Sequence, residues 1–179
     1  MILLVDLCYK KDSLSNYEFV RPIAKIVEKN FAVKHYTELV PEEVKKYEKI
    51  ILCGTALKDK SYLENIEKFA WLKSVNAPVL GICAGMQVIA LTFGSELTEA
   101  KEIGMKWIKL VKENKLFSRD LYVYELHGFG VKPSNEFEVL AESDKCVQAI
   151  KHKEKEIYGI MFHPEVRQEE IVRNFLKIQ

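Results

Sequence analysis

Residues 79–87 read VLGICAGMQ, an apolar run followed by a turn of small residues and then a stretch of helical character. Cys83 stands between Gly81 and Gly85, where the predicted strand gives way to the predicted helix. A residue on such a sharp turn is pushed into strained backbone geometry, and its neighbours must lack bulk for the turn to close. The stretch therefore predicts a strand, turn and helix with Cys83 at the carboxyl edge of a parallel sheet.

The residues around this stretch repeat the same pattern. Short β-branched apolar runs alternate with longer segments of helical period, which is typical of βα units and a largely parallel sheet. Strands are expected at 2–6, 31–36, 49–53 and 78–83, and helices at 16–29, 41–47, 62–75 and 85–93.

The second half of the chain has a different pattern. Runs of strand period are separated by polar turns, which predicts hairpins attached to the parallel part of the sheet. These strands are expected at 95–99, 106–112, 121–126, 137–142, 146–151 and 156–162, before a final helix at 167–177. A chain of 179 residues with no linker or repeat is interpreted as one domain, residues 1–179, around one core.

Composition excludes several classes of function. The 27 basic and 26 acidic residues nearly balance, so no long-range field favours nucleic acid. MILLVD at residues 1–6 is too short for a signal-peptide core, and no apolar run approaches the ~20 residues that a membrane span needs. We therefore expect a soluble, cytoplasmic protein that binds neither nucleic acid nor membrane.

The four cysteines are widely separated, at positions 8, 53, 83 and 146. Without a CxxC pair they favour neither a zinc knuckle nor a disulfide framework, so no metal is expected and any cysteine chemistry should come from one thiol. Cys83 is the candidate, because a helix N-terminus favours thiolate over thiol. The Ala84 amide could bind an oxyanion. A small buried cysteine at the end of a core strand is the alternative interpretation.

A thiol nucleophile needs a base, and His163 is the best candidate among four histidines. It ends the strand-like run IYGIMF and begins the segment HPE. Residues i and i+2 of an extended segment face the same way, so Glu165 could orient the His163 ring. Strands distant in sequence meet at one edge of a parallel sheet, which would bring His163 to Cys83.

GICAGMQ followed by IMFHPEV resembles the class I, triad-type glutamine amidotransferases, and the similarity spans most of the chain. The resemblance implies an α/β, flavodoxin-like three-layer sandwich with a mostly parallel sheet and additional antiparallel strands in the C-terminal half. It also implies that Cys83 attacks the side-chain amide of L-glutamine to form a thioester and release ammonia, that His163 carries the proton, and that Glu165 orients His163. No cofactor is implied.

The same resemblance extends to the candidate substrate contacts. Gln87 matches the family glutamine that holds the amino-acid end of the substrate, and Gly54 with the Thr55 amide would complete the oxyanion hole beside Ala84. Many members have a second glycine, often followed by proline, where this chain has Thr55 and Ala56. ELHGFGV at 125–131 resembles a segment that borders the glutamine pocket, so His127, Gly128 and Phe129 are substrate-contact candidates. A turn with a solvated histidine is the alternative.

KEIGMKWIKL at 101–110 resembles GMP-synthetase-like members of the family. No P-loop or second phosphate site is present, so the ammonia acceptor is expected on a separate synthetase polypeptide, with a GMP-synthetase-like partner as the first hypothesis. Two alternatives stay open: a free-standing hydrolase of γ-glutamyl amides, and a catalytically silent regulatory or binding module with the same fold.

Overall fold

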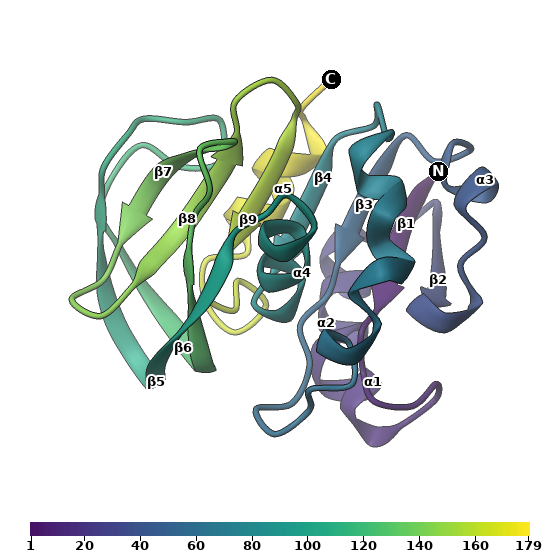
Figure 1. Ribbon diagram of the computed structural model, residues 1–179, viewed down its shortest axis with the longest axis horizontal. Helices are drawn as coiled ribbons and strands as arrows, with labels where there is room; N and C mark the ends of the chain where they lie inside the picture. The colour runs from purple at the N-terminus through teal and green to yellow at the C-terminus, as the bar shows by residue number, and fades with distance from the viewer.

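The structure is a computed structural model that describes residues 1–179 and contains one nine-stranded sheet of order β2-β1-β3-β4-β9-β8-β7-β5-β6 (Figure 1). The strands are β1 (Ile2–Asp6), β2 (Phe31–His35), β3 (Lys49–Leu52), β4 (Val79–Ile82), β5 (Glu96–Leu110), β6 (Leu121–Lys132), β7 (Phe137–Glu142), β8 (Val147–His152) and β9 (Ile157–Ile160). The expected α/β sandwich with extra antiparallel strands is confirmed.

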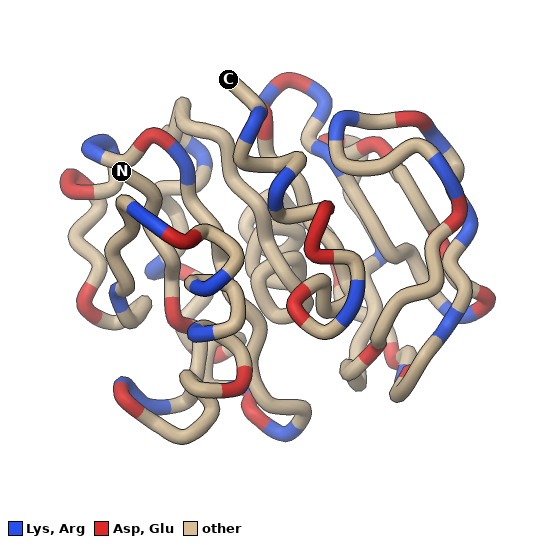
Figure 2. The backbone as a smooth tube through the Cα atoms, turned by 180° about the vertical axis from the view of Figure 1, so that it is seen from behind, with Lys and Arg blue, Asp and Glu red and all other residues tan.

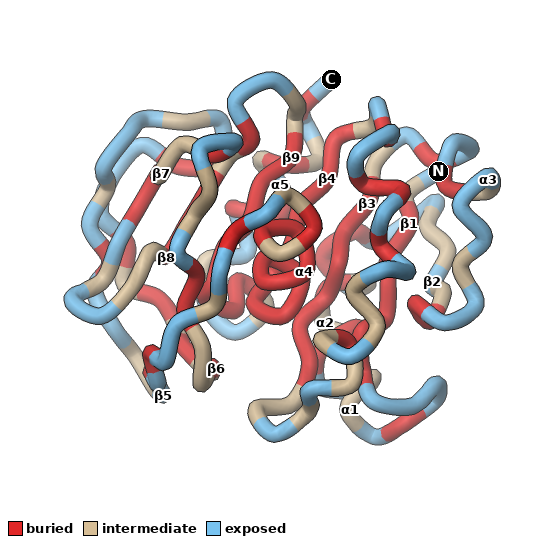
Figure 3. Tube along the Cα trace, viewed as in Figure 1, coloured by how far each residue is buried: buried red, intermediate tan, exposed pale blue.

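Five strands, from β2 to β9 in the sheet order, run parallel to one another. Strands β4 and β9 are buried along their whole length, as expected of central strands covered on both faces (Figure 3). Because β9 pairs directly with β4, the chain that leaves β9 emerges beside the chain that leaves β4. The pairing of β9 with β4 therefore places the C-terminal part of the chain next to the VLGICAGMQ stretch.

Helices cover both faces of the parallel half (Figure 1). The 3₁₀ helix η2 and helix α4 pack together on one face, and α2 and α5 pack together on the other. The helical segments are α1 (Leu14–Phe19), α2 (Arg21–Val27), η1 (Tyr36–Glu38), α3 (Pro41–Val44), η2 (Leu63–Lys73), α4 (Ala84–Thr92) and α5 (Glu170–Leu176). One continuous cluster of 50 buried residues draws on both halves of the chain, and the expected single domain over residues 1–179 stays a prediction.

The antiparallel half begins where β8 pairs with β9. The long β5 and β6 form a hairpin that joins the sheet only at Lys109 and Leu110, which pair with β7. A bulge between Glu99 and Glu102 interrupts this hairpin. A bulge changes the direction of the side chains beside it. The register of β5 against β6 therefore shifts at this point, where β6 approaches α4.

Several predicted elements differ in detail. The helix expected at 16–29 is two helices that meet at Val20 and Arg21, because Pro22 fits the first turn of a helix and not its interior. The segment expected to be a helix at 62–75 is 3₁₀ in character and is kinked at Asn65. The strands expected at 95–99 and 106–112 are one strand, β5, and the strand expected at 121–126 continues to Lys132.

Charged residues of both signs are interspersed along the whole backbone (Figure 2). No helix combines the length and the apolar character needed to cross a lipid bilayer.

Candidate active site

Cys83 occupies the junction between β4 and α4, with φ 50° and ψ −104°. A positive φ is rare for a residue with a side chain and costs about 1–3 kcal/mol, which the surrounding structure must supply. Only 4% of Cys83 is exposed. The turn thus holds the thiol in a strained, nearly enclosed position at the carboxyl edge of the sheet, as the sequence predicts.

The two flanking glycines allow this turn to pack. A Cβ on Gly81 would lie 2.5 Å from the carbonyl oxygen of Gly85. A Cβ on Gly85 would lie 2.3 Å from the carbonyl oxygen of Leu52 in β3. Both positions exclude a side chain because backbone, which cannot move aside cheaply, fills the space.

His163 reaches the same edge from β9. The Cys83 amide donates to the Ile160 carbonyl at 2.8 Å, which continues the pairing of β4 with β9. His163 Nδ1 lies 2.7 Å from Glu165 Oε1, and both side chains are buried. The structure therefore brings together the three residues that the sequence motifs single out.

The charges around His163 favour an imidazolium. Burial alone would lower its pKa, but the negative charges of Glu165 and of a Cys83 thiolate outweigh burial, so the pKa of His163 is raised well above its ordinary value. Nε2 of His163 is buried without a hydrogen-bond partner, while the Cys83 thiol donates to the Leu126 carbonyl at 3.6 Å. A proton taken from the thiol would satisfy this nitrogen.

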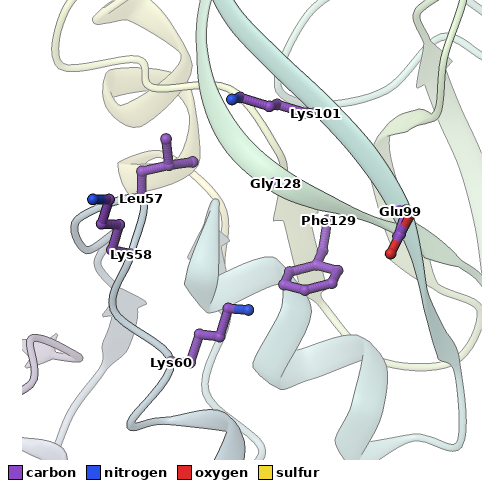
Figure 4. Close-up of a pocket in the computed structure, with 7 residues that line it drawn as sticks. All are labelled: Leu57, Lys58, Lys60, Glu99, Lys101, Gly128 and Phe129. Atoms are coloured by element: carbon purple, nitrogen blue, oxygen red, sulfur yellow. The ribbon is translucent and has the colours of Figure 1, made fainter.

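The space at Cys83 is small and opens toward a much larger depression. The chamber at the sulfur has a volume of about 20 Å³, whereas the depression beside it holds about 640 Å³. The two share a wall of four residues, Leu57, Lys60, Gly128 and Phe129. Figure 4 shows Lys60 approaching the Phe129 ring, and its Nζ lies 4.8 Å from the ring centroid. The Lys60 side chain and Phe129 thus narrow the way to the thiol.

The predicted oxyanion residues lie at this chamber or beside it. Thr55 and Ala84 both line it, and Ala84 is the first residue of α4. The Thr55 hydroxyl donates to Asp59 at 2.7 Å, which ties the loop back on itself. Gly54 has a separate reason to lack a side chain: a Cβ there would meet the His163 ring. The roles of these residues as oxyanion donors stay predictions.

Gln87 also lines the chamber, but its amide is held by the protein. Its Nε2 donates to the Phe129 carbonyl at 3.2 Å, and its Oε1 accepts from the Tyr62 hydroxyl. Gln87 therefore links α4 to β6 through a hydrogen bond. Its predicted contact with substrate requires the hydrogen bonds of its amide to rearrange.

The alternative of a solvated His127 in a turn is wrong. His127 lies within β6, its side chain is 1% exposed, and its Nε2 is 3.1 Å from Glu125 and 3.4 Å from Glu102. The 125–131 segment continues the strand because it pairs with β5 on both sides of the bulge. His127, Gly128 and Phe129 all border the chamber, and the last two also line the depression. Their contact with substrate stays a prediction.

Five residues that line the chamber were not predicted from the sequence: Leu57, Asp59, Lys60, Tyr62 and Leu126. Tyr62 and Lys60 belong to the segment that leads into η2, and Leu126 accepts from the Cys83 thiol only through its backbone carbonyl. Tyr62 and Lys60 belong to no motif. The only available signal for Leu126 was its place before His127 and Gly128 in ELHGFGV.

Known proteins are similar to this chain in sequence and in fold. The family described as "Glutamine amidotransferase class-I" matches residues 15–178. The glutamine-hydrolyzing GMP synthase subunit of Methanocaldococcus jannaschii is 46% identical over 112 residues, which cover 56% of this chain and 60% of that protein. The corresponding subunit of Archaeoglobus fulgidus is 34% identical over 148 residues, covering 76% of this chain and 79% of the relative. The chain spans less than two thirds of the length of the first of these relatives.

Solved structures show the same fold. A Thermoplasma acidophilum protein, described provisionally as a subunit of GMP synthase, superposes with a TM-score of 0.83 at 26% identity, covering 98% of this chain and 91% of that one. A glutamine amidotransferase of Thermotoga maritima superposes with a TM-score of 0.69 at 22% identity, covering 92% and 75% of the two chains.

Proposed function

Since this chain belongs to the class I glutamine amidotransferase family, we propose that it hydrolyses L-glutamine to glutamate and ammonia at Cys83. One observation carries the proposal: the strained Cys83 turn stands beside a buried His163 whose Nδ1 is held by Glu165 at 2.7 Å and whose Nε2 has no partner. A nucleophile, a base and a residue that orients the base thus meet at the end of two adjacent strands.

The proposed reaction uses these groups in sequence. His163 takes the Cys83 proton, and the thiolate attacks the side-chain carbonyl carbon of glutamine to form a tetrahedral oxyanion. The amides of Ala84 and Thr55 are the proposed donors to that oxyanion. His163 returns the proton to the leaving nitrogen, and ammonia departs as the thioester forms. Water, deprotonated by His163, then releases glutamate and restores the thiol.

We propose that the ammonia passes to a separate synthetase polypeptide. The relatives above are named as one subunit of a glutamine-hydrolyzing GMP synthase, which supports a GMP-synthetase-like partner. A name of this kind implies that the acceptor chemistry lies on another polypeptide. We place the protein in the cytoplasm, because a thiol nucleophile is best preserved where thiols stay reduced.

The size of the chamber bears on how such a partner acts. Only about 20 Å³ of the chamber is open to the centre of a water molecule, so we propose that a glutamine side chain enters only after the wall of the chamber moves. The wall formed by Lys60 and Phe129 must open for substrate to pass from the depression to the thiol. We propose that the bound synthetase favours the open arrangement, so that the isolated chain turns over slowly.

The test combines turnover with labelling. The protein should release glutamate from glutamine, faster when the synthetase is added, and a diazo ketone analogue of glutamine should modify Cys83. Cys83→Ala should abolish both, whereas Cys8→Ala, which removes another buried thiol, should leave both intact. High turnover without the partner on substituted γ-glutamyl amides would instead identify a free-standing hydrolase. Absence of both turnover and labelling would identify a silent binding module.

A further inference from the structure

A second cluster of reactive side chains lies between the β5–β6 hairpin and the turn before β8. Glu102 comes from β5, Glu125 and His127 from β6, and Cys146 from that turn. One ligand atom from each of Glu102, His127 and Cys146 lies within 4.8 Å of the others. The steps of the proposed glutaminase reaction use none of these side chains, although His127 also borders the chamber and is a predicted substrate contact.

The distances between the atoms fit a shared ion. In a tetrahedral zinc site with Zn–N, Zn–O and Zn–S bonds of about 2.0–2.3 Å, neighbouring ligand atoms are roughly 3.3–3.6 Å apart. Here His127 Nε2 is 3.4 Å from Glu102 Oε2, and Cys146 Sγ is 3.5 Å from the same oxygen. Glu125 Oε2 lies 3.1 Å from His127 Nε2 but outside the group of three whose ligand atoms converge, so it adds negative charge beside the cluster.

Cys146 donates to Glu102 within the cluster, but His127 and Glu125 are buried without hydrogen-bond partners. The side chains of His127 and Glu125 are 1% and 0% exposed, yet neither ring nitrogen of His127 and neither oxygen of Glu125 makes a hydrogen bond of acceptable geometry. Buried polar groups are almost always hydrogen-bonded, so unpaired groups that converge on one point indicate a missing ligand. Two carboxylates and a thiol surround the His127 imidazole, and this set of groups favours a bound cation.

Neighbouring residues hold the cluster in place. The Gln148 amide and the Ser143 hydroxyl donate to Glu102 Oε2 at 2.8 Å and 2.9 Å, as outer groups do when they orient a metal-bound carboxylate. Cys146 packs against Gly130, where a Cβ would lie 2.7 Å from the Cys146 Cβ. We propose that Glu102, His127 and Cys146, with a water molecule as fourth ligand, bind one Zn²⁺ ion that ties the β5–β6 hairpin to the turn before β8.

The ligand types select the ion. Thiolate, imidazole and carboxylate together suit Zn²⁺ better than Mg²⁺ or Ca²⁺, which prefer oxygen ligands alone. Burial, with added repulsion from Glu102, raises the pKa of Cys146 to about 12, so the thiol carries its proton while the site is empty. Zinc must displace that proton, and binding should release about one proton for each ion bound. The scattered ligands explain why cysteine spacing alone predicts no metal.

The experiment uses the full chain with Cys83→Ala, so that the Cys83 and His163 pair cannot supply ligands. The protein, freed of metal with a chelator, is titrated with Zn²⁺ against a chromophoric competitor and with Co²⁺ followed by absorption. We expect one ion per chain, a tetrahedral Co²⁺ spectrum and a thiolate charge-transfer band. These measurements need no glutaminase activity. Zinc binding can therefore fail while the proposed glutaminase function holds, and the glutaminase function can fail while zinc binding holds.

Adding Cys146→Ser should remove the charge-transfer band and weaken Zn²⁺ binding more than about tenfold. Adding Cys8→Ala, which removes a buried thiol outside the cluster, should change neither. If Cys146→Ser fails to fold, Glu102→Gln, which keeps the shape of the side chain, should weaken binding to a similar extent. A folded chain that binds no Zn²⁺, or that gives the same Co²⁺ spectrum and affinity after these substitutions, would overturn the proposal.

Discussion

Gly54 lies against His163 so closely that a Cβ on Gly54 would stand 2.8 Å from Cε1 and 3.4 Å from Nδ1 of the imidazole. The contact explains a glycine just after β3, because the ring occupies the space that a side chain would need. His163 is also enclosed by Phe19, whose ring centroid is 5.6 Å away. The His163 ring therefore has little room to move away from a side chain at position 54.

We predict that Gly54→Ala lowers kcat/KM for glutamine by about 100-fold, because a shift of about 1 Å in a catalytic group can cost that much. Glutamate release in the presence of the synthetase measures the loss, and thermal unfolding shows whether the fold survives. If a folded Gly54→Ala variant kept its kcat/KM, the His163 ring could shift without loss of activity, and Gly54 would serve another purpose.

The residues near Cys83 and His163 were predictable because their chemistry is encoded in short stretches. GICAGMQ contains the proposed nucleophile and both glycines that its turn requires, and HPE contains the proposed base and its carboxylate. The pairing of β4 with β9 was also accessible in outline, since alternating strands and helices predict a parallel sheet whose carboxyl ends meet.

Other features depend on contacts that no short stretch records. His127 is enclosed because Glu102, distant in sequence, stands opposite it across the β5–β6 pair. The narrowness of the chamber arises from Lys60 meeting Phe129, two segments joined only in the folded chain. The single long β5 was divided in the prediction because the bulge between Glu99 and Glu102 interrupts the alternation of side chains there.

The backbone strain at Cys83 leads to a prediction about stability. At φ 50° and ψ −104°, alanine is strained as cysteine is, whereas glycine tolerates a positive φ. Relief of about 1–3 kcal/mol of strain should exceed the ~0.5–1 kcal/mol that glycine loses through the flexibility of the unfolded chain. We expect Cys83→Gly to be about 1 kcal/mol more stable than Cys83→Ala, measured by urea unfolding. Equal stabilities would indicate that the turn carries no strain.

The raised pKa of His163 predicts how stability depends on pH. The folded protein holds the imidazole proton at pH values where the unfolded chain has lost it. The resulting stabilisation is fully present below the ordinary pKa of about 6.5 and is lost as pH rises through the raised value. We expect the free energy of unfolding to fall more steeply as pH rises above about 6.5 in the wild-type protein than in His163→Gln. If the free energy of unfolding depended on pH equally in the two proteins, the raised pKa of His163 would be contradicted.

Glu165 should set the upper pH limit of thiolate reactivity. Its charge raises the pKa of His163, so Glu165→Gln should lower that pKa and move the alkaline limb of the profile to lower pH. The measurement is the rate of Cys83 modification by the glutamine analogue as a function of pH, in the protein and the variant. A lower rate with an unshifted limb would show that Glu165 positions the ring without affecting its proton.

Gly128 offers a way to block the passage to Cys83 without disturbing the fold. It lies in β6, lines both the chamber and the depression, and has no atom within 4 Å of where its Cβ would be. Valine suits a strand, so Gly128→Val should retain stability or gain a fraction of a kcal/mol while its methyl groups enter the passage. We predict that KM for glutamine rises more than about tenfold, with a smaller rise for Gly128→Ala. Iodoacetamide, which is smaller than glutamine, should still alkylate Cys83 in both variants. If KM stays unchanged in Gly128→Val, glutamine reaches the thiol by another route, and the depression beside Phe129 is not its path.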